Sequence, residues 1–278
     1  MSVTTRAHAL TVPGAVLHYQ VSGSGPLLLV SQSGEGDADR GVDLVERLTD
    51  SYTVVTYDRR GLSRSRLTDP GRGASMADHA DDVARLLAEL TDAPALMLGC
   101  SIGAVIGLHT AVRHPGAVGT LIAHEPVAPR LLAPAERALH QAELTDIQEL
   151  YGREGLRVAL PEIARSLGID TSGRNSEPDL TPEPFDARRV ANFDRFIRHD
   201  LTALVEDTLD PAGLRDTATR ILPAVGGTTP PGVFDVRCAH ALAGLLGTGT
   251  YAMPGGHNGN TSHPRAWAAR LRELLADA

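Results

Sequence analysis

Residues 99–103 read G-C-S-I-G, a G-x-S-x-G motif whose central residue, Ser101, could act as a nucleophile. A short apolar run, residues 95–98, precedes the motif, and an apolar stretch with helical spacing, residues 104–113, follows it. In a strand-to-helix turn of this kind the serine is strained, and its hydroxyl projects above the sheet. The start of the helix also favours negative charge nearby. This context predicts that Ser101 is a nucleophile, whereas we expect Cys100 to be a small buried residue.

The composition excludes several other chemistries. All 26 basic residues are arginine, so the chain has no lysine for a Schiff base, for pyridoxal phosphate or for a Walker A phosphate loop. Its two cysteines, Cys100 and Cys238, lack the spacing of a zinc site or a disulfide framework. We therefore expect no metal and no cofactor.

The charge of the chain bears on its partners and its location. A net charge of −8 and an aromatic content of 4% argue against binding to nucleic acid or to an anionic membrane. The N-terminus has no leader pattern, and no apolar stretch is as long as the roughly 18 residues that a membrane span needs. We expect a cytoplasmic protein with a small-molecule substrate, and the sequence leaves its oligomeric state open.

Short apolar runs alternate with helix-length segments, which predicts an α/β fold with a largely parallel sheet flanked by helices. Residues 17–21 and 26–30 flank an S-G-S-G turn and are expected to form a hairpin-like pair of strands. Residues 52–57, rich in β-branched and aromatic side chains, predict a buried strand. Further strands are expected at residues 95–98, 119–123, 220–225 and 248–253, and a terminal helix at 266–275.

Residues 128–215 interrupt this alternation. They show only helical patterns, at 135–167 and 188–209, separated by a polar stretch that contains proline, at 171–186. We expect a helical cap lying over the sheet, while an ordinary run of crossover helices is the alternative. The core would then consist of residues 1–127 and 216–278.

Four motifs in this order resemble the α/β-hydrolase fold superfamily over nearly the whole chain: G-S-G-P at 23–26, Y-D-R-R-G-L-S-R-S at 57–65, the motif around Ser101, and P-G-G-H at 254–257. The resemblance implies a mostly parallel sheet of eight strands flanked by helices, and a cap after the sixth strand. It also implies a Ser, acid, His triad in that chain order, and a structural role for residues 57–65.

The resemblance places the general base at His257, between the last expected strand and the terminal helix. A histidine titrates close to neutral pH, so it can take the serine proton and return it to the leaving group. His263, which lies six residues later, is the alternative base.

The acid departs from the commoner family pattern, because the loop after residues 220–225 reads G-G-T-T-P-P and lacks a carboxylate. Glu125 follows the sixth expected strand, where some members, including a branch of the haloalkane dehalogenases, carry their acid. Asp235 is the alternative acid, a few residues beyond the usual position. A third possibility is that the site has no acid. The acid would hold the imidazole tautomer and stabilise the imidazolium.

The resemblance also implies an oxyanion hole made of two backbone N–H groups. One is expected from Ile102, and the other from Ser33 in the loop S-Q-S-G-E-G-D at residues 31–37. Family members usually have His-Gly in this loop, so the second donor depends on how the loop folds.

These residues indicate a serine hydrolase in which Ser101 attacks a carbonyl, His257 is base and then acid, and Glu125 orients His257. The expected substrates are small carboxylic esters, thioesters or lactones. One alternative is a cofactor-independent oxygenase or oxidase on the same scaffold, in which a histidine and an acid deprotonate the substrate. The other is a small-molecule binder that lacks catalysis.

Overall fold

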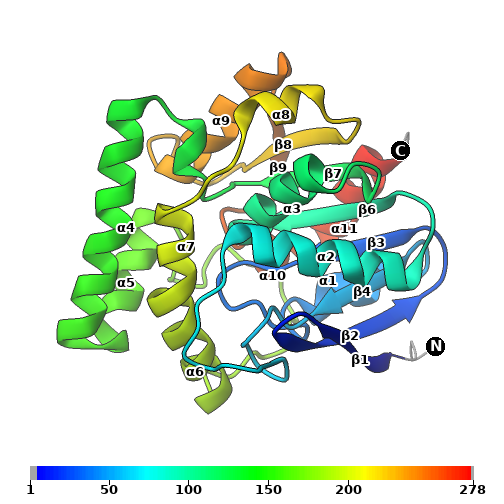
Figure 1. The fold of residues 1–278 in the computed structure, drawn as a ribbon, viewed down its shortest axis with the longest axis horizontal. Coiled ribbons are helices and arrows are strands. Elements are labelled where there is room, and N and C mark those ends of the chain that lie inside the picture. Colours follow the sequence, from blue (N-terminus) through cyan, green and yellow to red (C-terminus); the bar gives the residue numbers. More distant parts are fainter. Residues whose placement is uncertain (1–4, 277–278) are drawn as a thin grey trace.

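A computed structural model describes residues 5–276 of the chain, and its centre is a single sheet of nine strands. The strand order is β1-β2-β4-β3-β6-β7-β8-β9, and the two-residue strand β5 pairs with β2 (Figure 1). The strands are β1 Arg6–Val12, β2 Ala15–Gly23, β3 Leu27–Ser31, β4 Thr53–Tyr57, β5 Arg66–Leu67, β6 Ala95–Cys100, β7 Val118–His124, β8 Arg220–Gly226 and β9 Tyr251–Met253. This confirms the predicted α/β fold, with eight strands along the main path of the sheet.

The sheet is parallel from β4 to β9 and antiparallel where β1, β2 and β4 pair. The predicted hairpin between residues 17–21 and 26–30 is wrong, because β4 lies between β2 and β3 and pairs with both. Gly23 and Gly25 have φ values of 81° and 123°, and a Cβ on Gly23 would lie 2.5 Å from the carbonyl oxygen of Thr49. The two glycines therefore let the chain pass close over the end of α1 instead of reversing beside β2.

Helices cover both faces of the sheet, as a mostly parallel sheet requires. On one face, α1 and α11 contribute Leu44, Leu48, Trp267 and Leu271 to a cluster with β3, β4 and β6. On the other face, α2, α3 and α9 pack against the opposite side chains of the same strands. The helices around the sheet are α1 Val42–Leu48, α2 Met76–Leu90, α3 Ile102–Arg113, α8 Pro211–Asp216, α9 Phe234–Leu246, α10 Gly259–Ser262 and α11 Pro264–Leu275.

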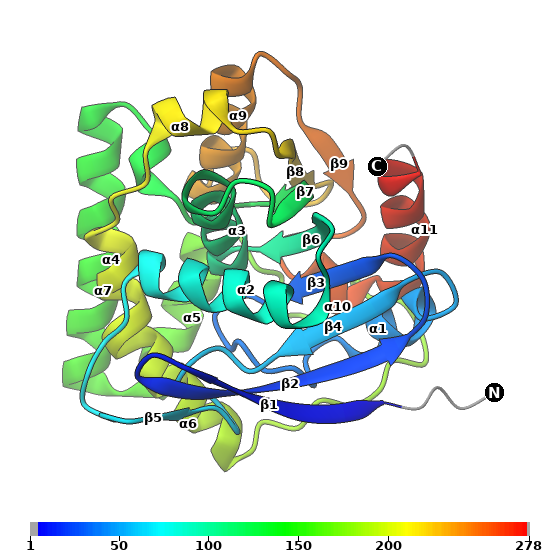
Figure 2. The same ribbon diagram turned by 45° about the vertical axis from the view of Figure 1, so that its right-hand side comes forward.

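The helices of residues 128–205 lie together beside one end of the sheet (Figures 1 and 2). They are η1 Pro129–Leu131, α4 Pro134–Glu154, α5 Leu156–Ser166, α6 Ala187–Arg195, η2 Phe196–Asp200 and α7 Leu201–Val205. The helical pattern predicted at residues 135–167 is divided at Gly155, whose φ is 78°. The pattern at 188–209 corresponds to α6, η2 and α7, in which η2 is a π-helix. We refer to residues 128–215 as the helical segment.

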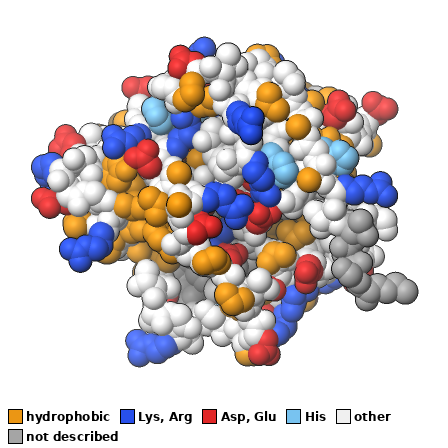
Figure 3. All heavy atoms as spheres, turned by 90° about the horizontal axis from the view of Figure 1, so that it is seen from below, with side chains coloured by type: hydrophobic (Ala, Val, Ile, Leu, Met, Phe, Trp, Pro, Cys, Tyr) orange, Lys and Arg blue, Asp and Glu red, His pale blue; other side chains and the backbone are white. Residues whose placement is uncertain are grey.

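The surface is mixed in character. On the face shown in Figure 3, acidic and basic side chains are interspersed, and hydrophobic side chains gather toward the side where α4 and α5 lie. Among residues 5–276, no helix is both long enough and apolar enough to cross a lipid bilayer.

The turn between β6 and α3 depends on the absence of a side chain at Gly103. A Cβ there would lie 2.1 Å from the carbonyl oxygen of Ser31, so backbone atoms of β3 would have to move. We expect Gly103→Ala to lower the free energy of unfolding by about 1–3 kcal/mol, as overpacking does, measured by urea denaturation.

Gly244→Ala is the matched control, because Gly244 lies within α9 and a Cβ there meets no atom within 4 Å. It should stabilise the protein by about 0.5–1 kcal/mol. Equal stability of Gly103→Ala and the wild type would contradict the close approach at the turn.

Candidate active site

Ser101 occupies a strained turn between β6 and α3, as its motif predicts. Its φ of 59° and ψ of −120° are unusual for a residue other than glycine. The turn is possible because Gly99 and Gly103 leave room for it, since a Cβ on Gly99 would lie 2.6 Å from the Cα of Ala104. The N–H of Ser101 donates to the carbonyl of His124 at 2.9 Å, so the turn is fixed to the end of β7.

His257 lies in the loop between β9 and α10, and two carboxylates meet its Nδ1. Glu125 Oε2 is 2.7 Å from this nitrogen and Asp235 Oδ2 is 2.6 Å from it. The other ring nitrogen, Nε2, is buried and has no hydrogen-bond partner among the described residues. The imidazole is thus fixed through Nδ1, while Nε2 remains without a partner among the described residues. His263, the alternative base, instead pairs through Nδ1 with the hydroxyl of its neighbour Ser262 at 2.9 Å.

The two carboxylates that the sequence offered as alternatives therefore lie at the same imidazole, but in different ways. Glu125 follows β7, and its Oε1 accepts from the N–H of Gly226 at 2.7 Å. Its Oε2 forms an aligned hydrogen bond with His257. Asp235 lies in the first turn of α9, where its Oδ1 accepts from the N–H of Val236 at 3.0 Å. Its Oδ2 is close to Nδ1 but not aligned for a hydrogen bond.

Burial and charge together set the protonation of these groups. Burial alone would lower the pKa of His257, but Asp235 and Glu125 outweigh it and raise that pKa. Burial raises the pKa of Asp235, and the charge of Glu125 adds to the effect. Burial alone would raise the pKa of Glu125. The positive charge that His124 and His257 carry when protonated, together with the hydrogen bond to His257, outweighs burial and lowers this pKa. Glu125 therefore loses its proton more readily than a free glutamate, whereas Asp235 and His257 hold their protons more firmly than usual.

His124 is a neutral neighbour of this cluster. Burial lowers its pKa to about 4, despite the opposing charge of Glu125. Its ring meets Trp267 edge to face, with ring centroids 4.8 Å apart, and lies 6.3 Å from the ring of His257. It therefore packs beside this cluster and carries no charge near neutral pH.

The side chains of Glu125, Asp235 and His257 also have the spacing of a cation site, because their ligand atoms lie within 4.8 Å of one another. Three buried groups at this distance can share either a cation or protons.

The loop after β3, residues 32–37, lies against the start of α3. The carbonyl oxygens of Ser31 and Gln32 are 2.1 and 2.8 Å from the position that a Cβ on Gly103 would take. Neither the N–H of Ser33 nor that of Ile102 forms a hydrogen bond within residues 5–276. The N–H groups of Ser33 and Ile102, the two expected oxyanion donors, are therefore not engaged in hydrogen bonds among the described residues, and they belong to two segments that pack against each other.

A family model described as the alpha/beta hydrolase fold matches residues 26–206, which is more than half of the chain. The chain belongs to the α/β-hydrolase fold family. It is 38% identical to the uncharacterized hydrolase YraK of Bacillus subtilis over 98% of this chain and 97% of that protein. These matches identify it as a hydrolase.

Solved structures share the fold at lower sequence identity. A putative epoxide hydrolase from Pseudomonas aeruginosa is 23% identical, with a TM-score of 0.69 over 98% of this chain and 95% of that one. The N-acyl homoserine lactonase AidH, solved with N-hexanoyl homoserine, is 20% identical, with a TM-score of 0.68 over 99% of this chain and 97% of that one.

The candidate site is buried. Ser101 and His257 are only 3% and 2% exposed. A small cavity lies where α4, α5, η2 and α7 meet the chain just before the helical segment, and its apolar walls come from Val127, Leu144, Ile147, Ile163, Leu167, Phe196 and Leu201. The one hydroxyl in its lining, that of Ser166, is buried without a partner among the described residues. With a volume of about 10 Å³, this cavity is a small void in the packing of the helical segment.

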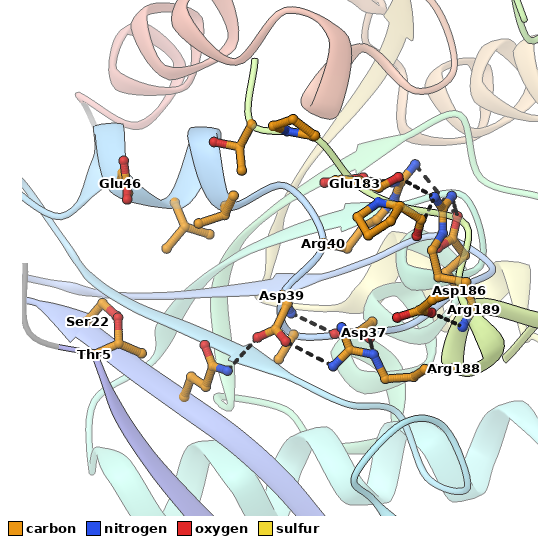
Figure 4. A pocket seen from close by; sticks show the side chains of 18 of the residues that line it. Thr5, Ser22, Asp37, Asp39, Arg40, Glu46, Glu183, Asp186, Arg188 and Arg189 are labelled. Atoms are coloured by element: carbon orange, nitrogen blue, oxygen red, sulfur yellow. Dashed lines mark hydrogen bonds and ion pairs between the residues drawn. The ribbon is translucent and has the colours of Figure 1, made fainter. Parts of the chain in front are cut away.

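A second cavity, of about 330 Å³, separates the loop after β3 from residues 181–189 of the helical segment. Figure 4 shows that charged side chains from both sides line it and pair across it. Arg189 Nη2 is 2.7 Å from Glu35 Oε1, and Arg188 Nη1 is 3.1 Å from Asp39 Oδ2. These ion pairs fasten the helical segment to the loop after β3.

Sequence reasoning missed three side chains near this loop, namely Arg59, Phe196 and Asp200. Arg59 was expected only to support a turn, but its guanidinium contacts carbonyls of the loop. Phe196 and Asp200 belong to η2, where Phe196 approaches the same loop and Asp200 pairs with Arg59. The only available signal was the second arginine in Y-D-R-R-G, which does not identify its partners.

Removing the charge of Asp235 should lower the pKa of His257, because one of the two carboxylates that stabilise the imidazolium is lost. We expect this shift in Asp235→Asn, measured by NMR titration of the histidine ring nitrogens. Asp207→Asn is the control, since Asp207 pairs with His109, at 2.6 Å, and not with His257. An unchanged pKa of His257 in Asp235→Asn would contradict the coupling.

Proposed function

We propose that the protein is a serine-type hydrolase that cleaves a small carboxylic ester, thioester or lactone through an acyl-enzyme on Ser101. His257 takes the proton of the Ser101 hydroxyl as Oγ attacks the carbonyl carbon, and it then protonates the leaving oxygen or sulfur. Water, deprotonated by His257, releases the acid and restores Ser101. Glu125 holds the imidazole and stabilises its charged form.

The observation that carries this proposal is the asymmetric environment of His257. Its Nδ1 is bonded to Glu125, and its Nε2 is buried with no partner among the described residues. A base needs this arrangement, since one nitrogen is fixed while the other is free to exchange a proton. Ser101, in its strained turn, is the nucleophile. Cys100 is unsuited to that role, because burial raises the pKa of its thiol.

The free N–H groups of Ile102 and Ser33 are the proposed oxyanion hole. Ile102 is the first residue of α3, so its N–H has no partner within the helix. Donors that are fixed before the reaction stabilise the oxyanion of the tetrahedral intermediate at no reorganisation cost.

The helical segment, residues 128–215, is proposed as the cap over a core of residues 1–127 and 216–278. The similar fold of AidH, a lactonase, is compatible with a lactone or another carbonyl substrate. Three buried side chains that share protons, rather than a cation, account for the Glu125, Asp235 and His257 cluster in this reaction.

An activated serine should react with a fluorophosphonate probe, whose phosphorus Oγ attacks with loss of fluoride. We expect one label per chain in the wild type by intact-mass spectrometry. Labelling should be absent in Ser101→Ala and severely slowed in His257→Ala. His263→Ala is the control variant and should label as the wild type does.

Failure of the folded wild-type protein to label would contradict the proposal. Oxygen uptake in the presence of a turned-over substrate would then support the cofactor-independent oxygenase. Ligand binding without turnover would support a non-catalytic binder.

Glu125 and Asp235 should contribute unequally to the reaction, because only Glu125 is aligned with Nδ1. Loss of the aligned acid in a triad lowers kcat by up to about 10⁴. We expect Glu125→Gln to slow labelling far more than Asp235→Asn, measured as the pseudo-first-order rate at several pH values. A larger loss in Asp235→Asn would reverse the assignment of the acid.

A further inference from the structure

The guanidinium of Arg59 lies beneath the loop after β3 and bonds to its backbone. Arg59 Nη1 donates to the carbonyl of Ser33 at 3.0 Å, and Nη2 donates to the carbonyl of Gly34 at 2.8 Å. A longer contact of 3.5 Å joins Nη1 to the carbonyl of Gln32. Arg59 is 2% exposed, and its own N–H donates to the carbonyl of Gly36 at 2.8 Å. One side chain thus collects the carbonyl oxygens of successive peptide units.

This arrangement determines where the N–H groups of the loop point. The peptide bonds of the described residues are all trans, and in a trans peptide the C=O and the following N–H point in opposite directions. When Arg59 attracts the carbonyl of Gln32, the N–H of Ser33 turns away from Arg59. When it attracts the carbonyl of Ser33, the N–H of Gly34 turns away in the same manner. The N–H of Ser33 is the proposed oxyanion donor.

Arg59 is held in place by the helical segment. Asp200 Oδ2 accepts from Nη2 at 2.7 Å and from Nε at 3.2 Å, and Asp200 is 3% exposed. Asp200 ends the π-helix η2, and Phe196, which begins it, lies against the same loop. A Cβ on Gly34 would be 2.9 Å from the Phe196 ring. The same short helix therefore fixes the arginine and covers the loop.

We propose that Arg59, oriented by Asp200, is a positioning residue that aligns the peptide planes of residues 32–34 so that the Ser33 N–H can serve the oxyanion. The inference rests on the proposed function. It implies that the loop is correctly set only when the helical segment is closed over it, because Asp200 comes from that segment.

The test is the kinetics of fluorophosphonate labelling in Arg59→Lys. Lysine keeps the positive charge beside Asp200 but cannot bond to two carbonyls and a carboxylate through a planar fork. We expect the rate constant of the chemical step to fall by about 10²–10³, as on loss of one oxyanion donor. The dissociation constant of the noncovalent probe complex should not change.

The matched control is Arg60→Lys. Arg60 is also buried and forms a two-pronged pair with Asp82, at 2.6 and 2.7 Å. Its remaining side-chain hydrogen bond within residues 5–276 goes to the carbonyl of Pro13, not to the loop after β3. Both variants should lose thermal stability, and only Arg59→Lys should lose labelling rate. Asp200→Asn should also lower the labelling rate, because the residue that orients Arg59 loses its charge. The decrease should be smaller than in Arg59→Lys, because the guanidinium of Arg59 is still present.

The outcomes separate the two proposals. An unlabelled wild type overturns the proposed function itself. A labelled wild type whose Arg59→Lys variant labels as fast as Arg60→Lys overturns the positioning role of Arg59 alone. If Arg59→Lys does not fold, Asp200→Asn decides, because a wild-type labelling rate in that variant overturns the inference.

Discussion

The imidazole of His257 and the carboxylates of Glu125 and Asp235 are ionisable groups buried together, so the surrounding structure must hold them in contact with one another. A buried charge is tolerated only when it is paired and hydrogen-bonded. Glu125 achieves this because its own N–H bonds to Ala224 of β8, at 2.9 Å, while its side chain accepts from Gly226 at 2.7 Å. The pairing of β7 with β8 thus fixes the carboxylate before the histidine meets it. Any shift in that register would separate these buried charges from their partners.

The sequence predicts the parts of the site that depend on local order. The motif around Ser101 contains its own geometric requirement, since Gly99 and Gly103 must lack side chains for the turn to close. The parallel sheet follows from buried strands that alternate with helices. His257 and both candidate acids follow from their places after strands, because the carboxyl ends of parallel strands meet at one edge.

Contacts between distant segments could not be predicted in the same way. The hairpin expected at residues 17–30 was wrong because local turn residues do not reveal that β4 inserts between β2 and β3. Glu125 and Asp235, which the sequence offers as alternative acids, both reach His257 in the fold. The bond between Arg59 and Asp200 spans 141 positions of the chain and leaves no periodic pattern. Only the folded arrangement brings such pairs together.

The π-helix η2 carries a consequence for how this family can vary. A π turn holds one residue more than an α-helical turn, so it is equivalent to an insertion of a single residue. Each residue of an α-helix turns the following side chains by about 100°. Deletion of one residue here would rotate Asp200 away from Arg59 while leaving Phe196 in place. The length of this turn and the residue type at position 59 should therefore change together during evolution, although neither would draw notice in a single sequence.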